Sequence, residues 1–231
     1  MGKFRKFIMS FKNLNLINPI IRAATEAGYS KPTEIQYAVI PHVLDGRDII
    51  VAETGLGKTA SFTIPILQLL KKYSPEHNEI RTLILTPNKE LAQKIEENFE
   101  VYSKYLPLSQ FSVFEGVLEG SQLAALRKRV DVLIATPVRL LDLVNRRYID
   151  LSKIEIFVLD EADRMLDLEF VNDIQKIMKL IPLKKQTLLF SSSMSPSIKK
   201  LAYTLLTNPK EIITNGSSMK KGTSQHPVYF S

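Results

Sequence analysis

The chain has 231 residues, a formal net charge of +7 and no cysteine. The lack of cysteine excludes disulfide bonds and thiolate metal sites, and it fits a reducing compartment. Hydrophobic residues make up 45% of the chain and charged residues 24%, which is ordinary for a globular protein and sufficient for one large α/β domain. The basic excess fits a polyanionic partner, although on charge alone solubility is an equally good explanation.

The first residues of the chain are basic but lack the long apolar stretch and the small-residue cleavage site of a secretory signal. No apolar run elsewhere approaches the roughly 18 residues that a membrane span requires. No two histidines have the spacing of a metal-ligand pair. We therefore expect a cytoplasmic protein without membrane contact that begins with a basic lead over residues 1–10.

Two helices are predicted first, one from Asn18-Pro19 to just before Gly28 and one from Pro32-Thr33 to about Leu44. Short apolar runs then predict strands at 48–52, 81–86, 110–114, 131–135, 154–159, 186–190 and 210–214. Helical patterns lie between them at 58–72, 89–104, 119–128, 138–146, 168–181 and 195–206. This alternation predicts one doubly wound α/β domain, with a mostly parallel sheet of about seven strands and helices on both faces.

A glycine-rich turn joins the first predicted strand to the helix that follows it, which is the context of a phosphate-binding P-loop. Gly55 and Gly57 let backbone N–H groups point inward, Lys58 can reach the β- and γ-phosphates, and the Thr59 hydroxyl can bind Mg²⁺. Ala52 stands where the general pattern begins with glycine, and a Gly-Lys-Thr triplet alone also occurs in plain turns. The candidate phosphate-binding residues are Thr54, Gly55, Leu56, Gly57, Lys58, Thr59 and Ala60.

Two adjacent acids follow the apolar strand predicted at 154–159. Asp160 would hold Mg²⁺, directly or through water, and Glu161 would orient and deprotonate the attacking water. Acids are also common at helix starts, so these residues alone would be equally consistent with a helix cap. The P-loop earlier in the chain favours the catalytic interpretation, in which Lys58, Asp160 and Glu161 act together.

The run Asp160-Glu161-Ala162-Asp163 resembles the signature of the DEAD-box ATP-dependent RNA helicases, and Arg164-Met165-Leu166-Asp167 continues it as in that family. The resemblance extends from about residue 11 to 214 and is to the first RecA-like domain of the family. It implies ATP and Mg²⁺ as cofactors, RNA as a partner that is held by its backbone, and a second RecA-like domain. The polar segment 215–231 would then be a linker toward that second domain.

Residues 28–36 resemble the Q motif of the family, which spans about 9–37 here. The resemblance implies that Gln36 recognises the edge of adenine, that Phe11 covers the base, and that Lys31 belongs to the same nucleotide-binding set. An amide has the donor and the acceptor that this edge requires. Without the resemblance, Gln36 would be expected on the surface of an amphipathic helix and Phe11 in the core.

Three further segments align with motifs that contact RNA in the family, and each departs from the family pattern. Asn88 and Lys89 replace Thr and Arg, Glu115 replaces the first glycine of a Gly-Gly pair, and Val138 replaces a glycine. Lys keeps the charge of Arg but not its bidentate geometry, and Glu115 adds negative charge beside a polyanion, so we expect a weaker grip on RNA. The candidate RNA-binding residues are Pro87, Asn88, Lys89, Gly116, Thr136, Pro137 and Arg139.

The run Ser191-Ser192-Ser193 stands where the family has Ser-Ala-Thr, the motif that links ATP hydrolysis to strand separation. The resemblance implies a coupling role for Ser191, Ser193 and Asp163. Ser193 keeps the hydroxyl of threonine, so we expect it to hydrogen-bond at or near Asp163. On sequence alone, a serine-rich turn that caps the helix after it would explain the same residues.

The resemblance therefore predicts an ATP-dependent RNA helicase, present as its N-terminal domain, nearly inactive in isolation and not expected to oligomerise. Two alternatives remain open at this point. One is a non-catalytic, ATP-dependent RNA clamp or scaffold, which the substitutions at 88, 89, 115, 138 and 192 leave open, although the intact Lys58, Thr59, Asp160 and Glu161 argue against it. The other is a different P-loop ATPase that acts on nucleic acid.

Overall fold

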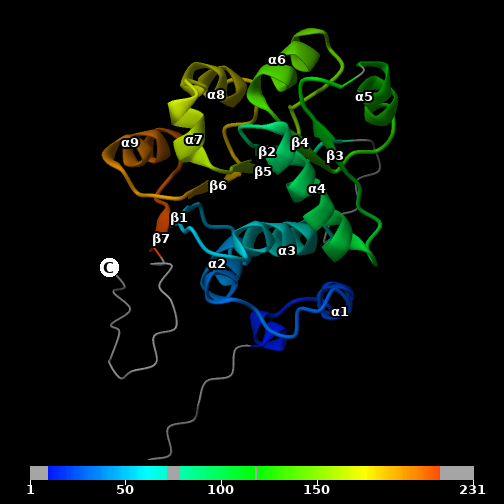
Figure 1. Ribbon diagram of the computed structural model, residues 1–231, viewed down its shortest axis with the longest axis vertical. Coiled ribbons are helices and arrows are strands. Elements are labelled where there is room, and N and C mark those ends of the chain that lie inside the picture. Colours follow the sequence, from blue (N-terminus) through cyan, green and yellow to red (C-terminus); the bar gives the residue numbers. More distant parts are fainter. Residues whose placement is uncertain (1–9, 72–78, 118, 214–231) are drawn as a thin grey trace, which may run out of the picture.

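The computed structural model describes residues 10–71, 79–117 and 119–213. The predicted polar tail at 215–231 lies outside the described residues, as does the predicted basic lead except for Ser10. Within the described part the chain forms an α/β sandwich in which helices cover both faces of one sheet (Figure 1). No helix of these residues is both long and apolar enough to cross a membrane.

The sheet of the described residues has seven strands in the order β3-β4-β2-β5-β6-β1-β7. Every paired neighbour is parallel, so the predicted strands and their parallel arrangement are confirmed. Observed strand ends differ from the predicted ones by at most two residues. The strands are β1 (Ile49–Ala52), β2 (Thr82–Leu85), β3 (Gln110–Val113), β4 (Val132–Ala135), β5 (Ile156–Leu159), β6 (Gln186–Ser191) and β7 (Lys210–Ile213).

The helices fall into two groups, one on each face of the sheet. A short 3₁₀ helix η1 (Phe11–Leu14) precedes α1 (Asn18–Glu26), α2 (Glu34–Leu44), α3 (Lys58–Lys71) and α4 (Lys89–Ser103), which cover one face. The opposite face carries α5 (Glu119–Leu126), α6 (Pro137–Asn145), α7 (Ala162–Asp167), α8 (Val171–Met178) and α9 (Pro196–Leu205). Figure 1 shows α2 and α3 below the sheet and α6 to α8 above it.

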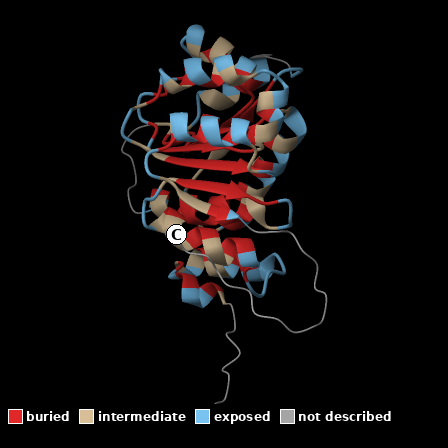
Figure 2. Ribbon diagram, turned by 90° about the vertical axis from the view of Figure 1, so that its left-hand side faces the viewer, coloured by how far each residue is buried: buried red, intermediate tan, exposed pale blue. Residues whose placement is uncertain are grey.

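The central strands are buried on both faces, which explains why they lack polar alternation. Ile49 and Val51 of β1 pack into the core cluster that includes α2 and α3, whereas Ile50 between them packs into the cluster on the other face. Successive side chains of a strand point to opposite faces, so both faces require apolar residues here. The buried sheet between two helical layers is visible in Figure 2.

The helix predicted at 168–181 is wrong in its extent. Only α8 lies within that range, residues 168–170 form a turn, and α7 before this turn was not predicted. Glu169 adopts a left-handed conformation with φ of +59°, and the N–H of Phe170 donates to the carbonyl of Met165 at 3.0 Å. This is the hydrogen-bond pattern that ends many helices, usually with a glycine at the left-handed position. Because glutamate stands there instead, the sequence carried no stop signal.

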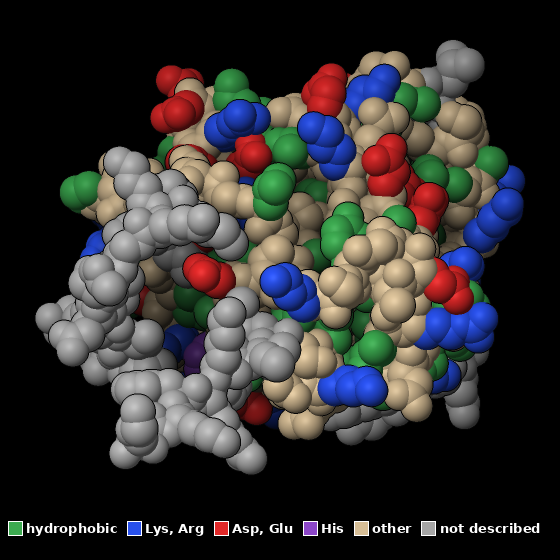
Figure 3. All heavy atoms as spheres, turned by 60° about the horizontal axis from the view of Figure 1, so that its bottom comes forward, with side chains coloured by type: hydrophobic (Ala, Val, Ile, Leu, Met, Phe, Trp, Pro, Cys, Tyr) green, Lys and Arg blue, Asp and Glu red, His purple; other side chains and the backbone are tan. Residues whose placement is uncertain are grey.

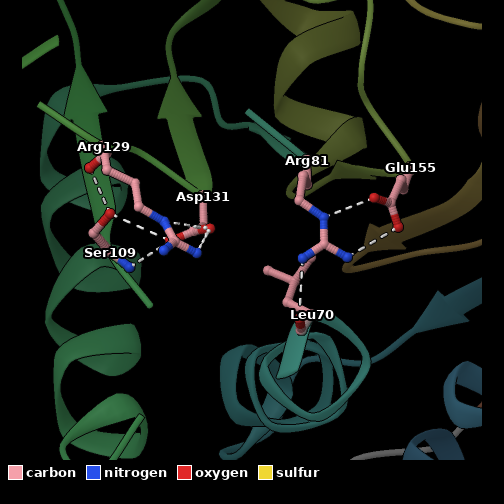
Figure 4. Close-up of polar contacts among 6 residues, drawn as sticks. All are labelled: Leu70, Arg81, Ser109, Arg129, Asp131 and Glu155. Carbon is pink, nitrogen blue, oxygen red and sulfur yellow. Dashed lines mark hydrogen bonds and ion pairs between the residues drawn. The ribbon is translucent and has the colours of Figure 1, made fainter. Parts of the chain in front are cut away.

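Charged residues fix the amino ends of the strands, at the edge opposite the candidate site (Figure 4). Arg81, just before β2, is 3% exposed and binds Glu155 at 2.7 Å and the carbonyl of Leu70 at 3.0 Å. Asp131, just before β4, is fully buried and accepts hydrogen bonds from the N–H of Ser109 at 2.9 Å and from Arg129 at 2.8 Å. These buried charges are paired, as burial of a charge requires.

Candidate nucleotide site and RNA-facing edge

The predicted site residues outside the Q motif gather at one edge of the sheet because all strands are parallel. They follow the carboxyl ends of β1, β2, β3, β4, β5 and β6. Ligands of such sheets bind beyond this edge. The strand order places β1, β6 and β5 side by side, so the loops after these three strands are neighbours.

Figure 3 shows the molecule with its lower end forward. On this face the Lys and Arg side chains are scattered among other types and do not form one basic patch.

The P-loop turn leads directly from β1 into α3, as predicted. Gly57 has φ of +100°, a conformation that favours glycine. A side chain there would also have no room, because its first carbon would lie 2.5 Å from the Thr33 hydroxyl oxygen and 2.9 Å from the Gln36 amide nitrogen. The loop therefore needs glycine at 57 both for its backbone shape and for its contact with the start of α2.

Gln36 is buried, not on the surface, and its side chain contacts the P-loop. Its amide oxygen accepts the N–H of Thr33 at 3.1 Å in a capping box, and its amide nitrogen donates to the carbonyl of Gly57 at 3.3 Å. Phe11 is 4% exposed and packs in the core, so little of its ring is free to cover a base. Lys31 is exposed. Adenine recognition by these residues stays a prediction.

The three predicted catalytic residues lie together. The Lys58 ammonium is 3.0 Å from a carboxylate oxygen of Asp160 and 4.0 Å from one of Glu161. Asp160 is 2% exposed, so Lys58 supplies the counter-charge that a buried carboxylate needs. No group of three or more acidic, histidine or cysteine side chains that could hold a metal ion occurs in the described residues.

Glu161 occupies a special backbone and electrostatic position. Its φ of +56° is uncommon for a residue with a side chain, and such conformations cluster at functional sites. Burial raises the pKa of Glu161 above its ordinary value, and the Lys58 ammonium opposes this shift. A raised pKa suits a group that takes a proton from water near neutral pH.

The hydroxyl that contacts Asp163 comes from Ser192, not from Ser193 as expected. The N–H of Ser192 donates to Asp163 at 3.2 Å, and its hydroxyl donates to the same oxygen. Ser193 instead places its N–H 3.4 Å from the hydroxyl oxygen of Ser191. Burial acts to raise the pKa of Asp163, but the hydrogen bonds from Ser192 and from the backbone of Asp163 and Arg164 together lower it below its ordinary value. The sequence did hold a signal for this contact, since Ser192 stands where the family has alanine and therefore adds a hydroxyl.

Ser191 links this segment to the P-loop. It is the last residue of β6, is fully buried, and its carbonyl accepts the N–H of Glu53 at 3.0 Å. The loop after β1 and the loop after β6 are therefore joined through the backbone, and Ser192 joins the second of these to the acids after β5. The predicted coupling residues form a continuous set of contacts with the nucleotide site.

The segments after β2, β3 and β4, which were predicted to contact RNA, are held by contacts within the chain. The Thr136 hydroxyl, in a residue that is 3% exposed, donates to the Glu115 carboxylate at 2.6 Å. The Asn88 side chain caps α4 by accepting a hydrogen bond from the N–H of Leu91 at 3.0 Å, so this residue has a structural role. The Lys89 ammonium lies 5.5 Å from the centre of the Phe114 ring. Gly116 has φ of +81°, and Pro137 is the first residue of α6.

Gln122 is a residue that sequence reasoning missed in this region. It is 3% exposed on α5, donates to the carbonyl of Phe114 at 2.9 Å and accepts from the Arg139 guanidinium at 3.1 Å. Arg139 also binds Asp142 at 2.6 Å. Gln122 thus ties the segment at 114–116 to the one at 136–139. A glutamine on a weakly patterned helix carries no sequence signal of such a bridge.

The chain matches the family model for the DEAD/DEAH box helicases over residues 33–201. It is 40% identical to the ATP-dependent RNA helicase DeaD of Klebsiella pneumoniae over 209 residues, which cover 90% of this chain and 32% of that protein. It is also 40% identical to the probable ATP-dependent RNA helicase DDX47 of Homo sapiens, covering 87% of this chain and 44% of that one. The chain thus spans about a third to under half of these relatives' length.

Comparison with solved structures indicates the same family. The crystal structure of a DEAD box protein from the hyperthermophile Methanococcus jannaschii superimposes with a TM-score of 0.82 at 36% sequence identity, covering 90% of this chain and 56% of that one. Sequence and structure therefore agree on the RecA-like P-loop fold that the motifs indicated. Because the family model, the sequence identity to these relatives and the shared fold all agree, the chain belongs to the DEAD/DEAH box helicase family.

Proposed function

We propose that this chain is the ATP-binding domain of an ATP-dependent RNA helicase, with residues 11–214 as the domain and a second RecA-like domain completing the enzyme. The observation that carries the proposal is the position of Lys58, 3.0 Å from Asp160 and 4.0 Å from Glu161. The P-loop lysine and the two acids of the family signature therefore share one site. This is the set of charges that phosphoryl transfer to water requires.

The phosphates of an adenine nucleotide would bind at the P-loop, where backbone N–H groups and the lysine at the start of α3 are available as donors. The glycine at 57, where any side chain would collide with Thr33 and Gln36, keeps the turn tight. Residues 54 to 60 would hold the phosphates, and Lys58 would offset charge on the γ-phosphoryl group. The Lys58 ammonium has three N–H donors, so it could bind the γ-phosphate either beside Asp160 or in its place.

Mg²⁺ fits the oxygen donors that lie beside the loop. The Asp160 carboxylate and the Thr59 hydroxyl are hard ligands of the kind that Mg²⁺ takes together with water and phosphate. Bound Mg²⁺ would supply positive charge next to the phosphates. It would also replace the counter-charge that Asp160 receives from Lys58 in the present structure. Glu161, whose pKa is raised by burial, would orient the attacking water and accept its proton.

RNA would lie along the edge formed by the segments at 86–89, 114–116 and 136–139. Binding through Asn88, Lys89, Gly116, Thr136 and Arg139 would reach sugar and phosphate, so little sequence preference is expected. The RNA backbone would compete with the contacts that Glu115 and Asp142 already make there. We therefore propose weak RNA binding by this edge alone.

The experiment that tests this function is RNA-stimulated ATP hydrolysis by the protein with its second domain, beside the Glu161→Gln variant. We expect single-stranded RNA to accelerate hydrolysis, single-stranded DNA to do so much less, and the variant to be inactive. Equal stimulation by DNA would favour a different nucleic-acid-dependent ATPase. A Glu161→Gln variant as active as the wild type would refute the assigned role of Glu161.

An RNA clamp is the second candidate, because this chain departs from the family pattern at 88, 89, 115, 138 and 192. Glu115 replaces a glycine of the family pattern and holds the Thr136 hydroxyl at 2.6 Å, so this edge is not the usual one. A clamp would bind RNA in an ATP-dependent manner without turnover. ATP-dependent RNA binding by a wild-type protein that does not hydrolyse ATP would select this candidate.

A further inference from the structure

Glu53 is a buried acid in the P-loop turn to which the proposed chemistry assigns no role. It is 7% exposed and directly follows β1. Its backbone N–H is held by the carbonyl of Ser191 at 3.0 Å, so the residue is anchored to the neighbouring strand. Burying a carboxylate is costly unless hydrogen bonds or an opposite charge compensate it. The contacts of its side chain therefore indicate what this carboxylate does.

The Glu53 carboxylate accepts the backbone N–H of Gly55, two residues further along the loop. A side-chain carbon at position 55 would lie 2.6 Å from the same carboxylate oxygen, so glycine is needed for the approach. Inward N–H groups of a P-loop are the donors that hold nucleotide phosphates. In this structure one of these donors is already occupied by an anion of the chain itself.

Lys58 shows the complementary arrangement in the same loop. Its ammonium, which a nucleotide phosphate would engage, lies 3.0 Å from Asp160. Glu53 therefore supplies an anion to the loop's amide, while Asp160 supplies an anion to the loop's lysine. Charge-assisted hydrogen bonds of this kind are roughly twice as strong as neutral ones. A nucleotide phosphate that replaces them therefore binds with a lower net affinity than it would at an unoccupied loop.

We propose that Glu53 is a phosphate surrogate, which holds the Gly55 amide when no nucleotide is bound and competes with a nucleotide phosphate for that amide. This inference rests on the proposed function, in which the loop binds nucleotide phosphates. It assigns to Glu53 control over the affinity for the phosphate part of the ligand. The affinity for the nucleoside part should not change, because the hydrogen bonds of Glu53 described above are to Gly55 and Ser191, and not to Phe11 or Gln36.

The test compares ADP, pyrophosphate and adenosine binding to the 231-residue chain by calorimetry or by displacement of a fluorescent nucleotide. Glu53→Ala should tighten ADP and pyrophosphate by about fivefold to tenfold, since the competing charge-assisted bond is removed. Glu53→Gln keeps a neutral acceptor and should give a smaller gain of the same sign. Adenosine affinity should not change. Glu100→Gln, at an exposed site on α4, controls for the change in net charge.

Two further measurements separate this proposal from its alternatives. The amide proton resonance of Gly55 should move upfield in Glu53→Gln, because its hydrogen bond weakens. If ADP binds no tighter, or binds more weakly, to folded Glu53 variants, the carboxylate supports the loop and does not compete, and the proposal is wrong. If Lys58→Met leaves ADP binding unchanged, the loop does not hold phosphate and the proposed function itself fails.

Discussion

The carboxylate of Glu115 accepts a hydrogen bond of 2.6 Å from the Thr136 hydroxyl, on the edge proposed to contact RNA. Replacing Glu115 with glycine would free this hydroxyl and remove a negative charge from the path of the RNA phosphates. A hydrogen bond to a charged group contributes ~1.5–3 kcal/mol in general, and solvent around the exposed Glu115 reduces this to about 1 kcal/mol. We therefore expect Glu115→Gly to raise RNA affinity about fivefold.

The assay is fluorescence anisotropy of a labelled single-stranded RNA over a series of salt concentrations. Glu115→Gln keeps an uncharged acceptor for Thr136 and should give a smaller gain, about twofold. The slope of affinity against salt should not change, because no cationic contact to phosphate is added. Adding Val138→Gly, at an exposed position of α6, should increase the gain by letting the backbone approach closer. Unchanged affinity of the double variant at every salt concentration would refute the reasoning.

Three other substitutions test individual contacts. Ser192→Ala should raise the pKa of Asp163, because it removes the hydroxyl hydrogen bond that lowers this pKa and keeps the backbone one, and carbon-detected NMR titration measures the shift. Gln122→Met should lower the free energy of unfolding by about 1–3 kcal/mol, since the Phe114 carbonyl loses the hydrogen bond from Gln122 and the Arg139 guanidinium loses one of its partners. Gln93→Met, on the exposed side of α4, should have little effect in the same urea titration. Asp131→Ala should cost about 2–4 kcal/mol in that assay but leave ADP affinity unchanged, because Asp131 lies at the opposite edge of the sheet.

The contribution of Asp163 to stability has a definite sign with pH. Its pKa is below the ordinary value of 3.8 in the folded state, so its hydrogen bonds stabilise fully above that value. The stability difference between wild type and Ser192→Ala should therefore shrink as the pH falls through the lowered pKa. Ser193→Ala should show no such difference, and an equal effect of the two substitutions would contradict the assignment of the contact to Ser192.

Local patterns in the sequence predicted most of the fold. The strands were recognisable because Ile49, Ile50 and Val51 and their counterparts are buried on both sides, so an unbroken apolar run is required. The P-loop was recognisable because its geometry demands glycine at 57. The break at Glu169 was missed because a non-glycine residue there adopts the left-handed conformation, held by tertiary packing around α7 and α8.

The site was predictable to the level of residue sets but not of individual contacts. Sequence placed Asp163 and the serines after β6 together, yet the choice of Ser192 over Ser193 depends on how the loop leaves the strand. The contacts of Gln122 with Arg139 and of Glu115 with Thr136 require segments that are distant in sequence to approach each other. The contact of Glu53 with Gly55 requires a particular shape of the P-loop turn. Residue type alone cannot specify such distances.

The pairing of β1 has a consequence for the order in which this domain folds. β1 carries the P-loop but pairs with β6 and β7, and the Asp48 carboxylate just before it accepts the N–H of Thr187, 139 residues later. Contacts so distant in sequence form slowly and only once both partners are available. During synthesis on the ribosome, β1 therefore gains its strand partners only after most of the domain has emerged. Chains shortened before β6 should leave an apolar strand without neighbours and be prone to aggregation.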